Sequence, residues 1–411
     1  MIRYAEAVLE GHPDKFADQI ADRIIEEAYR FDDEAYGQIE VGVWSDRIWL
    51  NGSIATRQPF TTDIRDLVVE VGKKIGYTPE NHIDVEQYHI DSQICFITDD
   101  PRSWTQSVND QAICIGWAGY DEQTHYLPPE QFLVHFLRQT LIEELKNGSL
   151  SGEGPDGKLL VRIKEHTTGW ELEHILCTLQ HRPTTLLLDL TTEVVEILSK
   201  VYADLQSKDP RWCRPWKDIE LLINPNGLLI EAGSDGDNGQ TGRKLVMDYY
   251  GPRIPIGGGA LSGKDLAHID RAGAYAARRA ALDAVRSGAR SCQVTVVYAP
   301  NRDKPLDVCY EMEGRGKRWP ADSFRHSRIR TINGGFRDLG NLGAGYHFFD
   351  SGLPWNMAER VAGCRARVTT ICRGSEQTDA LTIHLKRLRI TGNRRRRGDT
   401  TRSIRLPSRV R

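Results

Sequence analysis

The amino-acid sequence predicts an α+β protein with helices on one face of its sheets. Segments with the pattern of paired strands are followed by amphipathic helices, and this order recurs about three times in 411 residues. Proline opens some of the predicted helices and glycine closes others, which marks their ends. A chain of this length is long enough for two or three domains with hydrophobic cores of their own.

The first predicted helix spans 13–30, where Phe16, Ile20, Ile24 and Ala28 recur at a spacing of four. The same criteria place further helices at 62–77, 128–148, 191–205 and 269–288. Strands are expected as a pair joined by a Ser-Asp turn within 38–56, and at 158–163, 171–180 and 291–300. Residues 98–109 are rich in turn-forming side chains and predict a loop.

We expect three α+β domains at 1–100, 108–232 and 233–360, followed by a basic tail at 361–411. The strand and helix pattern weakens after about residue 313, and the last residues are rich in arginine with almost no acid. This composition predicts a poorly packed tail. Read-through or frame-shifted sequence is an alternative explanation of the same change in composition.

The composition is ordinary for a soluble globular protein, with 39% hydrophobic and 27% charged residues and a formal net charge of −3. Nucleic acid is therefore not an expected partner, and the arginine-rich tail lacks the interleaved aromatic residues that stack on bases. No stretch is apolar enough to span a membrane, and the start lacks the apolar core of a signal peptide. We expect a cytoplasmic protein whose eight cysteines, none of them spaced as CxxC, are buried reduced thiols.

The first chemical motif is Glu10-Gly11-His12-Pro13-Asp14-Lys15, at the start of the first predicted helix. Helix N-termini present free N–H groups and a positive dipole end, which attract phosphate. His12 is suited to donate a hydrogen bond to an oxygen that gains charge, and Asp14 to hold a Mg²⁺. By itself the hexamer is more simply explained as a helix that starts with proline and an acid.

The second motif is Gly257-Gly258-Gly259-Ala260-Leu261-Ser262-Gly263-Lys264-Asp265. Residues 258–264 fit the G-x-x-x-x-G-K part of a phosphate loop, but Asp265 stands where a Ser or Thr should follow. The preceding segment is also interrupted by prolines, which argues against a true Walker loop. A glycine-rich cradle for an anion, with Lys264 beside it, is the functional interpretation. A flexible glycine linker is the structural one.

The third motif joins Asn224-Pro225-Asn226-Gly227 to the segment 236–244, GDNGQTGRK. The second part places Asp237, Arg243 and Lys244 on a tight turn. Arginine can bridge two phosphate oxygens, and lysine acts as a point charge. Either half alone would be a plain surface turn, whereas both together favour an anion site.

Three weaker signals are equally consistent with structural roles. Residues 155–158, PDGK, have the composition of a type I turn before a strand. Asp270-Arg271 opens the alanine-rich helix, where an acid is common. Glu40 lies in a predicted strand, where an exposed sheet position would explain it.

In this order, these segments resemble the S-adenosylmethionine synthetase (methionine adenosyltransferase) family. The resemblance extends from about residue 6 to about residue 300, and the pair GHPDK and GGGALSGKD is its most specific part. The last third matches faintly, through Tyr346-His347-Phe348 and Pro354-Trp355. The matching segments are GHPDK, NDQ at 109–111, PDGK, INPNG, GDNGQTGRK, GGGALSGKD and IDRAGAYAARR.

The resemblance implies three similar α+β domains in a pseudo-threefold arrangement. It implies a homodimer or homotetramer with active sites at the subunit interface. The family joins ATP and methionine: the methionine sulfur attacks C5′ of the ribose and expels the triphosphate, which is then cleaved to pyrophosphate and phosphate. Two Mg²⁺ ions and K⁺ are the implied cofactors.

Carried over position by position, the resemblance also implies roles for individual residues. Catalysis would fall to His12, Lys158, Arg243 and Lys264. Asp14 and Asp270 would hold Mg²⁺, Glu40 would serve K⁺, and methionine would contact Asp237 and His268. ATP and its phosphates would be bound by His12, Lys15, Asp110, Asp156, Gly157, Lys158, Asp237, Arg243, Lys244, Ala260 and Lys264.

The sequence departs from the family pattern at positions that concern methionine and adenine. Ser53 replaces a glutamate near the methionine amino group, Leu229 replaces a phenylalanine that stacks on adenine, and His268 replaces a lysine. The gating loop near 98–109 is shortened. A same-fold enzyme that uses another sulfur nucleophile or chiefly cleaves triphosphate, and a catalytically weak nucleotide-binding regulatory subunit, are therefore alternative hypotheses.

Overall fold

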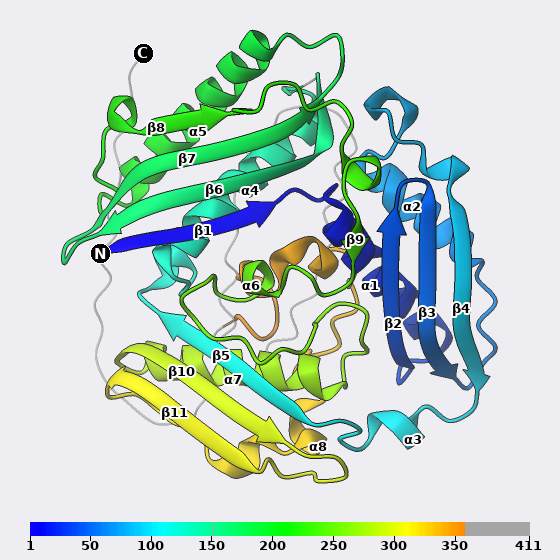
Figure 1. Ribbon diagram of the computed structural model, residues 1–411. Coiled ribbons are helices and arrows are strands. Elements are labelled where there is room, and N and C mark those ends of the chain that lie inside the picture. The colour runs from blue at the N-terminus through cyan, green and yellow to red at the C-terminus, as the bar shows by residue number, and fades with distance from the viewer. Residues whose placement is uncertain (151, 358–411) are drawn as a thin grey trace, which may run out of the picture. The chain divides into compact units, whose positions relative to one another are not determined.

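Three separate sheets organise the chain in the computed structural model, which describes residues 1–150 and 152–357 (Figure 1). All of these residues fall within one compact unit, Met1–Arg360. The predicted basic tail at 361–411 lies outside the described residues. No helix in the described part of the chain is long and apolar enough to cross a membrane.

The first sheet has the strand order β1-β6-β7-β8. It consists of β1 (Ile2–Val8), β6 (Glu153–Glu165), β7 (Trp170–His181) and β8 (Glu220–Ile223). Its pairs are antiparallel except β7 with β8, which is parallel. Helix α4 (Pro129–Asn147) packs on β1 and β6, and α5 (Leu187–Lys208) packs beside α4.

The second sheet has the order β4-β3-β2-β9. It contains β2 (Tyr36–Trp44), β3 (Arg47–Thr56), β4 (His89–Thr98) and the two-residue β9 (Gly239–Gln240). Strands β2 and β3 form a hairpin around the predicted Ser-Asp turn, and β4 lies parallel to β3. Helix α1 (Pro13–Phe31) packs on β2, and α2 (Ile64–Ile75) packs on α1.

The third sheet has the order β11-β10-β5, with both pairs antiparallel. It contains β5 (Ala112–Gly119), β10 (Ala289–Tyr298) and β11 (Asp307–Gly314). Helix α7 (Ile269–Arg286) covers β5 and β10. The contact is so close that a side chain at Gly116 would overlap the backbone of Ala277. The alanine-rich face of α7 and this glycine together allow the helix to lie on the strand.

The predicted α+β class is confirmed, and each predicted helix and strand has a counterpart in the structure. The predicted loop at 98–109 contains the four-residue helix α3 (Arg102–Thr105). Six strands were not predicted from the sequence: β1, β4, β5, β8, β9 and β11. Each sheet combines segments from distant parts of the chain, because β1 joins β6, β5 joins β10 and β9 joins β2. The domain ranges 1–100, 108–232 and 233–360 therefore stay a prediction.

The expectation that the cysteines are buried is wrong for half of the described ones. Cys114, Cys177 and Cys292 are buried free thiols, whereas Cys95, Cys213 and Cys309 are exposed. The exposed thiols lie on β4, on β11 and in the segment after α5, outside the core. Cys364 and Cys372 lie outside the described residues.

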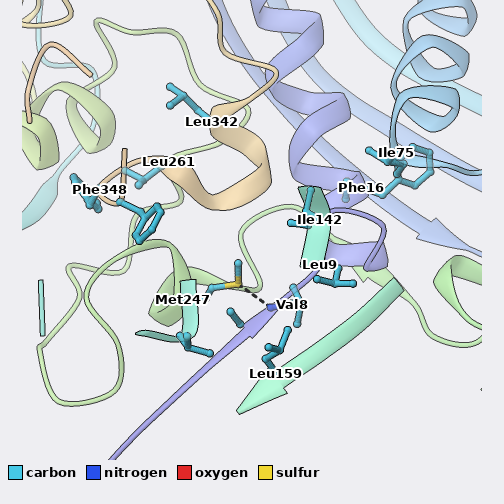
Figure 2. Packing of buried hydrophobic residues seen from close by; sticks show 14 of the residues in the cluster. Val8, Leu9, Phe16, Ile75, Ile142, Leu159, Met247, Leu261, Leu342 and Phe348 are labelled. Atoms are coloured by element: carbon cyan, nitrogen blue, oxygen red, sulfur yellow. Dashed lines mark hydrogen bonds between the residues drawn. The ribbon is translucent and has the colours of Figure 1, made fainter. Parts of the chain in front are cut away.

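The main hydrophobic core lies where β1, α1, α2 and α4 meet the segments after β9 (Figure 2). The backbone N–H of Val8, at the end of β1, donates to Met247 Sδ at 3.4 Å (Figure 2). Met247 lies on the short helix α6 (Leu245–Asp248). The chain that follows β1 is thus enclosed by the core on its way into α1, which keeps the start of that helix in a fixed position.

The segment near residue 350 is also part of this packing. The rings of Trp355 and Tyr275 stack with their centroids 3.7 Å apart. The Trp355 indole Nε1–H donates to the carbonyl of His347 at 2.7 Å, and neither aromatic side chain is exposed. This segment therefore covers the side of α7 that the third sheet does not.

We predict that Gly116→Ala destabilises the protein, because the added methyl group meets backbone that cannot rotate away. A loss of about 1–3 kcal/mol or more is expected for such overpacking. Gly42→Ala in β2 is the matched control, since its nearest neighbour would be Trp49 Cε3 at 3.9 Å. Thermal unfolding of the two variants checks this, and an equal midpoint for both would contradict the close packing of α7 on β5.

Candidate functional site

The N-terminus of α1 is capped by His12. The His12 Nδ1 accepts the backbone N–H of Asp14 at 3.2 Å, with Pro13 in the first helical position. The side chain is 1% exposed. Because Nδ1 is an acceptor, the proton of the neutral imidazole lies on Nε2. That Nε2 has no hydrogen-bond partner among residues 1–150 and 152–357, so a buried donor is held ready for a ligand.

The charge state of His12 is set by its surroundings. Burial, followed by the positive charges of Lys244 and Lys158, lowers the pKa of His12 to about 3, although Asp14 opposes this. His12 is therefore neutral at ordinary pH. A neutral imidazole with Nε2–H can donate a hydrogen bond to a negatively charged oxygen without giving up its proton.

The GDNGQTGRK segment is fastened to the first turns of α1. Asp14 Oδ1 accepts the backbone N–H of Gln240 at 2.9 Å, and Asp18 Oδ1 accepts that of Gly242 at 2.9 Å. Asp14 Oδ2 forms an ion pair with Lys244, and Arg243 Nε lies 3.6 Å from Asp14 Oδ1. These contacts place two cations beside the start of α1.

The PDGK segment lies beside the residues that lead from β1 into α1. The backbone N–H of Leu9 donates to the carbonyl of Gly157 at 2.9 Å, which continues the pairing of β1 with β6. Lys158 is exposed, and its charge acts on His12. Asp156 is 8% exposed, and its Oδ2 accepts the N–H of Gly233 at 2.8 Å.

The second carboxylate oxygen of Asp156 is available to accept a hydrogen bond. Its Oδ1 is buried without a partner in the described residues. Burial raises the pKa of Asp156 to about 6, and the nearby charge of Asp237 contributes. Asp237 is exposed beside it. We call these residues the His12 cluster: His12, Asp14, Asp156, Gly157, Lys158, Asp237, Arg243 and Lys244.

The N-terminus of α7 repeats the arrangement of α1. His268 is the N-cap, and its Nδ1 accepts the backbone N–H of Asp270 at 3.2 Å. Asp270 Oδ2 forms an ion pair with Lys264 at 2.6 Å. A His-x-Asp sequence thus opens both helices, and each aspartate holds a lysine from a glycine-rich segment. His268, which the family resemblance predicts to contact methionine, is thus also the N-cap of α7, and its contact to methionine stays a prediction.

Further predicted residues gather at this second helix end. Burial and Lys264 lower the pKa of His268 to about 4, and the charges of Asp270 and Asp110 oppose this, which places Asp110 nearby. Burial raises the pKa of Glu40, and Lys264 opposes that rise. A side chain at Gly259 would meet Asp270. We call this group the His268 cluster: Glu40, Asp110, Ala260, Lys264, His268 and Asp270.

The two clusters adjoin through their glycine-rich segments. A side chain added at Gly242, in the first segment, would lie 2.8 Å from Cβ of Ala260 in the second. Both segments are also bound to α1, because Asp22 Oδ1 accepts the N–H of Gly263 at 2.9 Å. The structure therefore brings together the predicted residues in two neighbouring groups on one chain.

Lys15, which was expected to bind phosphate, lies in the core and in neither cluster. Its side chain is 0% exposed, and its Nζ donates to Asp18 Oδ2 at 2.9 Å and to Asp248. Burial disfavours the charged amine, but the two carboxylates outweigh it and the pKa of Lys15 is raised. Lys15 faces the core because it lies on the inner side of α1. It therefore neutralises buried carboxylates and does not face a phosphate group.

Of the three departures from the family pattern, His268 belongs to the His268 cluster, whereas Ser53 and Leu229 belong to neither cluster. Ser53 is half-buried in β3, opposite Gln38. The backbone N–H of Leu229 donates to His181 Nε2 at 3.1 Å. Asp18, Asp22 and Asp248 were missed from the sequence, although Asp14, Asp18 and Asp22 recur at a spacing of four, which places them on one face of α1.

Comparisons with known proteins place the chain in a family. Residues 1–96 match the S-adenosylmethionine synthetase N-terminal domain, and residues 232–330 match the C-terminal domain. The chain is similar to an S-adenosylmethionine synthase of Acholeplasma laidlawii, with 32% identity over 330 residues, 76% of this chain and 82% of the relative. The chain is also similar to an S-adenosylmethionine synthase of Zymomonas mobilis, with 31% identity over 76% of this chain and 81% of the relative. A synthase of a Synechococcus strain is 32% identical over 76% of this chain and 80% of the relative. The chain belongs to the S-adenosylmethionine synthetase family.

We predict that Lys15→Met is strongly destabilising, because it leaves Asp18 and Asp248 without their counter-charge. Breaking a buried pair in this way costs about 3–5 kcal/mol. Lys158→Met, at an exposed position, should leave the free energy of unfolding nearly unchanged. Denaturant unfolding of both variants checks this, and a stable Lys15→Met protein would restore a surface role for Lys15.

We also predict a pH dependence that comes from His12. Its pKa is lower in the folded protein than in the unfolded chain, so the unfolded chain binds more protons as the pH falls. The stabilisation is complete above about pH 6.5 and is lost as the pH falls toward 3. His12→Asn, which keeps a helix-capping side chain, should reduce the slope of stability against pH by up to about 1.4 kcal/mol per unit. Identical slopes would show that His12 titrates normally.

Proposed function

We propose that this protein transfers the adenosyl group of ATP to the sulfur of methionine. A lone pair of the sulfur forms the bond to C5′, the C5′–O bond breaks, and its electrons leave with the triphosphate. Water then cleaves the triphosphate to pyrophosphate and phosphate. Family membership supports the reaction, and the observation that carries it is the buried, unpartnered Nε2–H of His12, on which the positive charges of Lys158 and Lys244 act.

His12 acts on the oxygen that departs from C5′ in this proposal. The leaving group gains negative charge as the bond breaks, and a pre-oriented donor stabilises that charge more than it stabilises bound ATP. The Nδ1 cap bond fixes the ring, so no reorientation is required when the charge develops. Lys158 and Arg243 are exposed, which leaves their charges accessible to phosphate oxygens.

Lys244 and Lys264 have a second function in the absence of substrate. Each lysine neutralises one aspartate, Asp14 or Asp270, and so occupies the place of a cation beside a carboxylate. A bound triphosphate attracts both amines, which frees the two carboxylates. Paired charges of this kind keep the site stable without ligand and can be exchanged when an anion arrives.

The freed carboxylates fit the proposed metal sites. No group of three or more His, Cys, Asp or Glu side chains within residues 1–150 and 152–357 is arranged to hold a metal by itself. Mg²⁺ commonly takes one or two carboxylates and completes its shell with phosphate oxygens and water. Asp14 and Asp270 would each hold one Mg²⁺, and the half-buried Glu40 would serve K⁺. Bound there, the ions would neutralise negative charge on the triphosphate.

The remaining assignments belong to the same proposal. The unpartnered Oδ1 of Asp156 and the exposed carboxylate of Asp237 would accept hydrogen bonds from nucleotide and methionine. His268 and Asp110 complete the second helix end. We further propose a cytoplasmic homodimer or homotetramer with the active sites at the subunit interface, as in the family that the chain belongs to.

We predict that the protein with ATP, methionine, Mg²⁺ and K⁺ produces S-adenosylmethionine together with phosphate and pyrophosphate. Mass spectrometry for the sulfonium product and a phosphate assay measure the two halves of the reaction. Cleavage of the triphosphate without adenosyl transfer, or nucleotide binding without turnover, would refute the proposed reaction.

We predict that His12→Asn lowers adenosyl transfer about 10²–10³-fold with little effect on ATP affinity, because its donor acts on charge in the transition state. His89→Asn is the matched control, since its side chain is 68% exposed on β4. Single-turnover kinetics and equilibrium ATP binding separate the two quantities. An equal loss of rate and affinity would contradict the role of His12.

A further inference from the structure

A cavity adjoins the chain segments that carry the His12 cluster. It has a volume of about 380 Å³, which is within the range of small-molecule sites. It is bordered by the C-terminal ends of α2 and α4 and by the start of β6. Its floor is apolar and is formed by Ile75, Ile142, Leu145 and Leu150. Figure 2 includes Ile75 and Ile142 among the side chains of the core.

The charges around this cavity are unequal. Four basic residues border it, Lys73, Lys74, Lys146 and Arg182, against two acids, Glu10 and Glu153. Three of the basic side chains already have partners, because Lys73 pairs with Glu86, Lys74 donates to Asn341 at 2.9 Å and Lys146 pairs with Glu10 at 2.7 Å. The excess of positive charge favours an anionic group in the ligand.

Arg182 and Glu153 are the groups available to a ligand. Arg182 Nε donates to the Asn81 side chain at 3.3 Å, and no carboxylate within the described residues lies in ion-pair distance of its guanidinium. Glu153 is 4% exposed, and its Oε1 is buried without a partner in the described part of the chain. Although both residues border the same cavity, no ion pair joins them there.

We propose that this cavity binds a small aliphatic α-amino acid. The carboxylate of the ligand would pair with Arg182, its ammonium group with Glu153, and its side chain with the apolar floor. A zwitterion satisfies both charges at once, which neither a simple anion nor an amine does. A nucleotide fits less well, because none of the described residues that line the cavity is aromatic and a base would have nothing to stack on.

The cavity shares a wall with the proposed active site. Glu10 and Pro155 border it. Two residues after Glu10 lies His12, and directly after Pro155 lies Asp156, both members of the His12 cluster. The two segments are joined by a hydrogen bond from the N–H of Gly11 to the carbonyl of Pro155 at 3.2 Å. Lys146, which also borders the cavity, pairs with Glu10 one residue before this bond.

Binding of L-leucine to the full chain tests the proposal, measured by calorimetry in the absence of ATP. Two analogues each lack one charged group of leucine: 4-methylpentanoate lacks the ammonium group and 3-methylbutylamine lacks the carboxylate. We predict that each binds about tenfold or more weakly than leucine, as expected for the loss of one charge-assisted hydrogen bond. Equal binding of leucine and 4-methylpentanoate would overturn the proposal, as would an absence of leucine binding at millimolar concentration.

Variants assign the binding to this cavity. Glu153→Gln and Arg182→Met should each weaken leucine about tenfold or more, and Glu153→Gln should leave the affinity for 4-methylpentanoate unchanged. Glu220→Gln, an exposed acid on β8 away from the cavity, is the matched control. Asp237→Asn distinguishes this cavity from the proposed methionine site. Loss of leucine binding in Asp237→Asn but not in Glu153→Gln would refute the second site, whereas failure of adenosyl transfer alone would refute only the proposed reaction.

Discussion

The arrangement of the whole site depends on the hydrogen bonds that one acidic face of α1 accepts. Asp14, Asp18 and Asp22 lie one turn apart and accept the backbone N–H groups of Gln240, Gly242 and Gly263. Glycine-rich segments have many conformations when free, and fixing them costs conformational entropy. Charge-assisted hydrogen bonds to a rigid helix offset that cost. Two segments that are distant from α1 in sequence are thereby held against its first turns.

The same face of α1 carries its own counter-charges. Lys15 bonds to Asp18, and Arg271 donates to Asp22 at 2.8 Å, with both cations fully buried. Buried carboxylates would otherwise be costly to ionise. Because Arg271 belongs to α7, its bond to Asp22 also joins the two helices whose N-termini bear the clusters. Lys244 and Lys264 pair instead with Asp14 and Asp270, at the N-termini of the two helices.

The interleaved sheets explain why one chain can present two similar helix ends side by side. Strand β1 leads from the first sheet directly into α1, and β9 joins the second sheet within the segment that α1 holds. Each of these short connections fixes a functional segment by backbone pairing. The cavity beside the His12 cluster lies where the ends of α2 and α4 and the start of β6 meet the chain that enters α1.

The sequence alone was enough to predict the α+β class, the helix at 13–30 that opens with proline, and the glycine-rich motifs, because these features depend on local periodicity, helix-start residues and composition. It also contained the spacing of Asp14, Asp18 and Asp22. Three features became visible only in the folded chain: Lys15 is buried, His268 caps a helix, and β5 pairs with β10. Burial and strand pairing depend on contacts between distant segments. The local pattern therefore could not show that Lys15 faces the core.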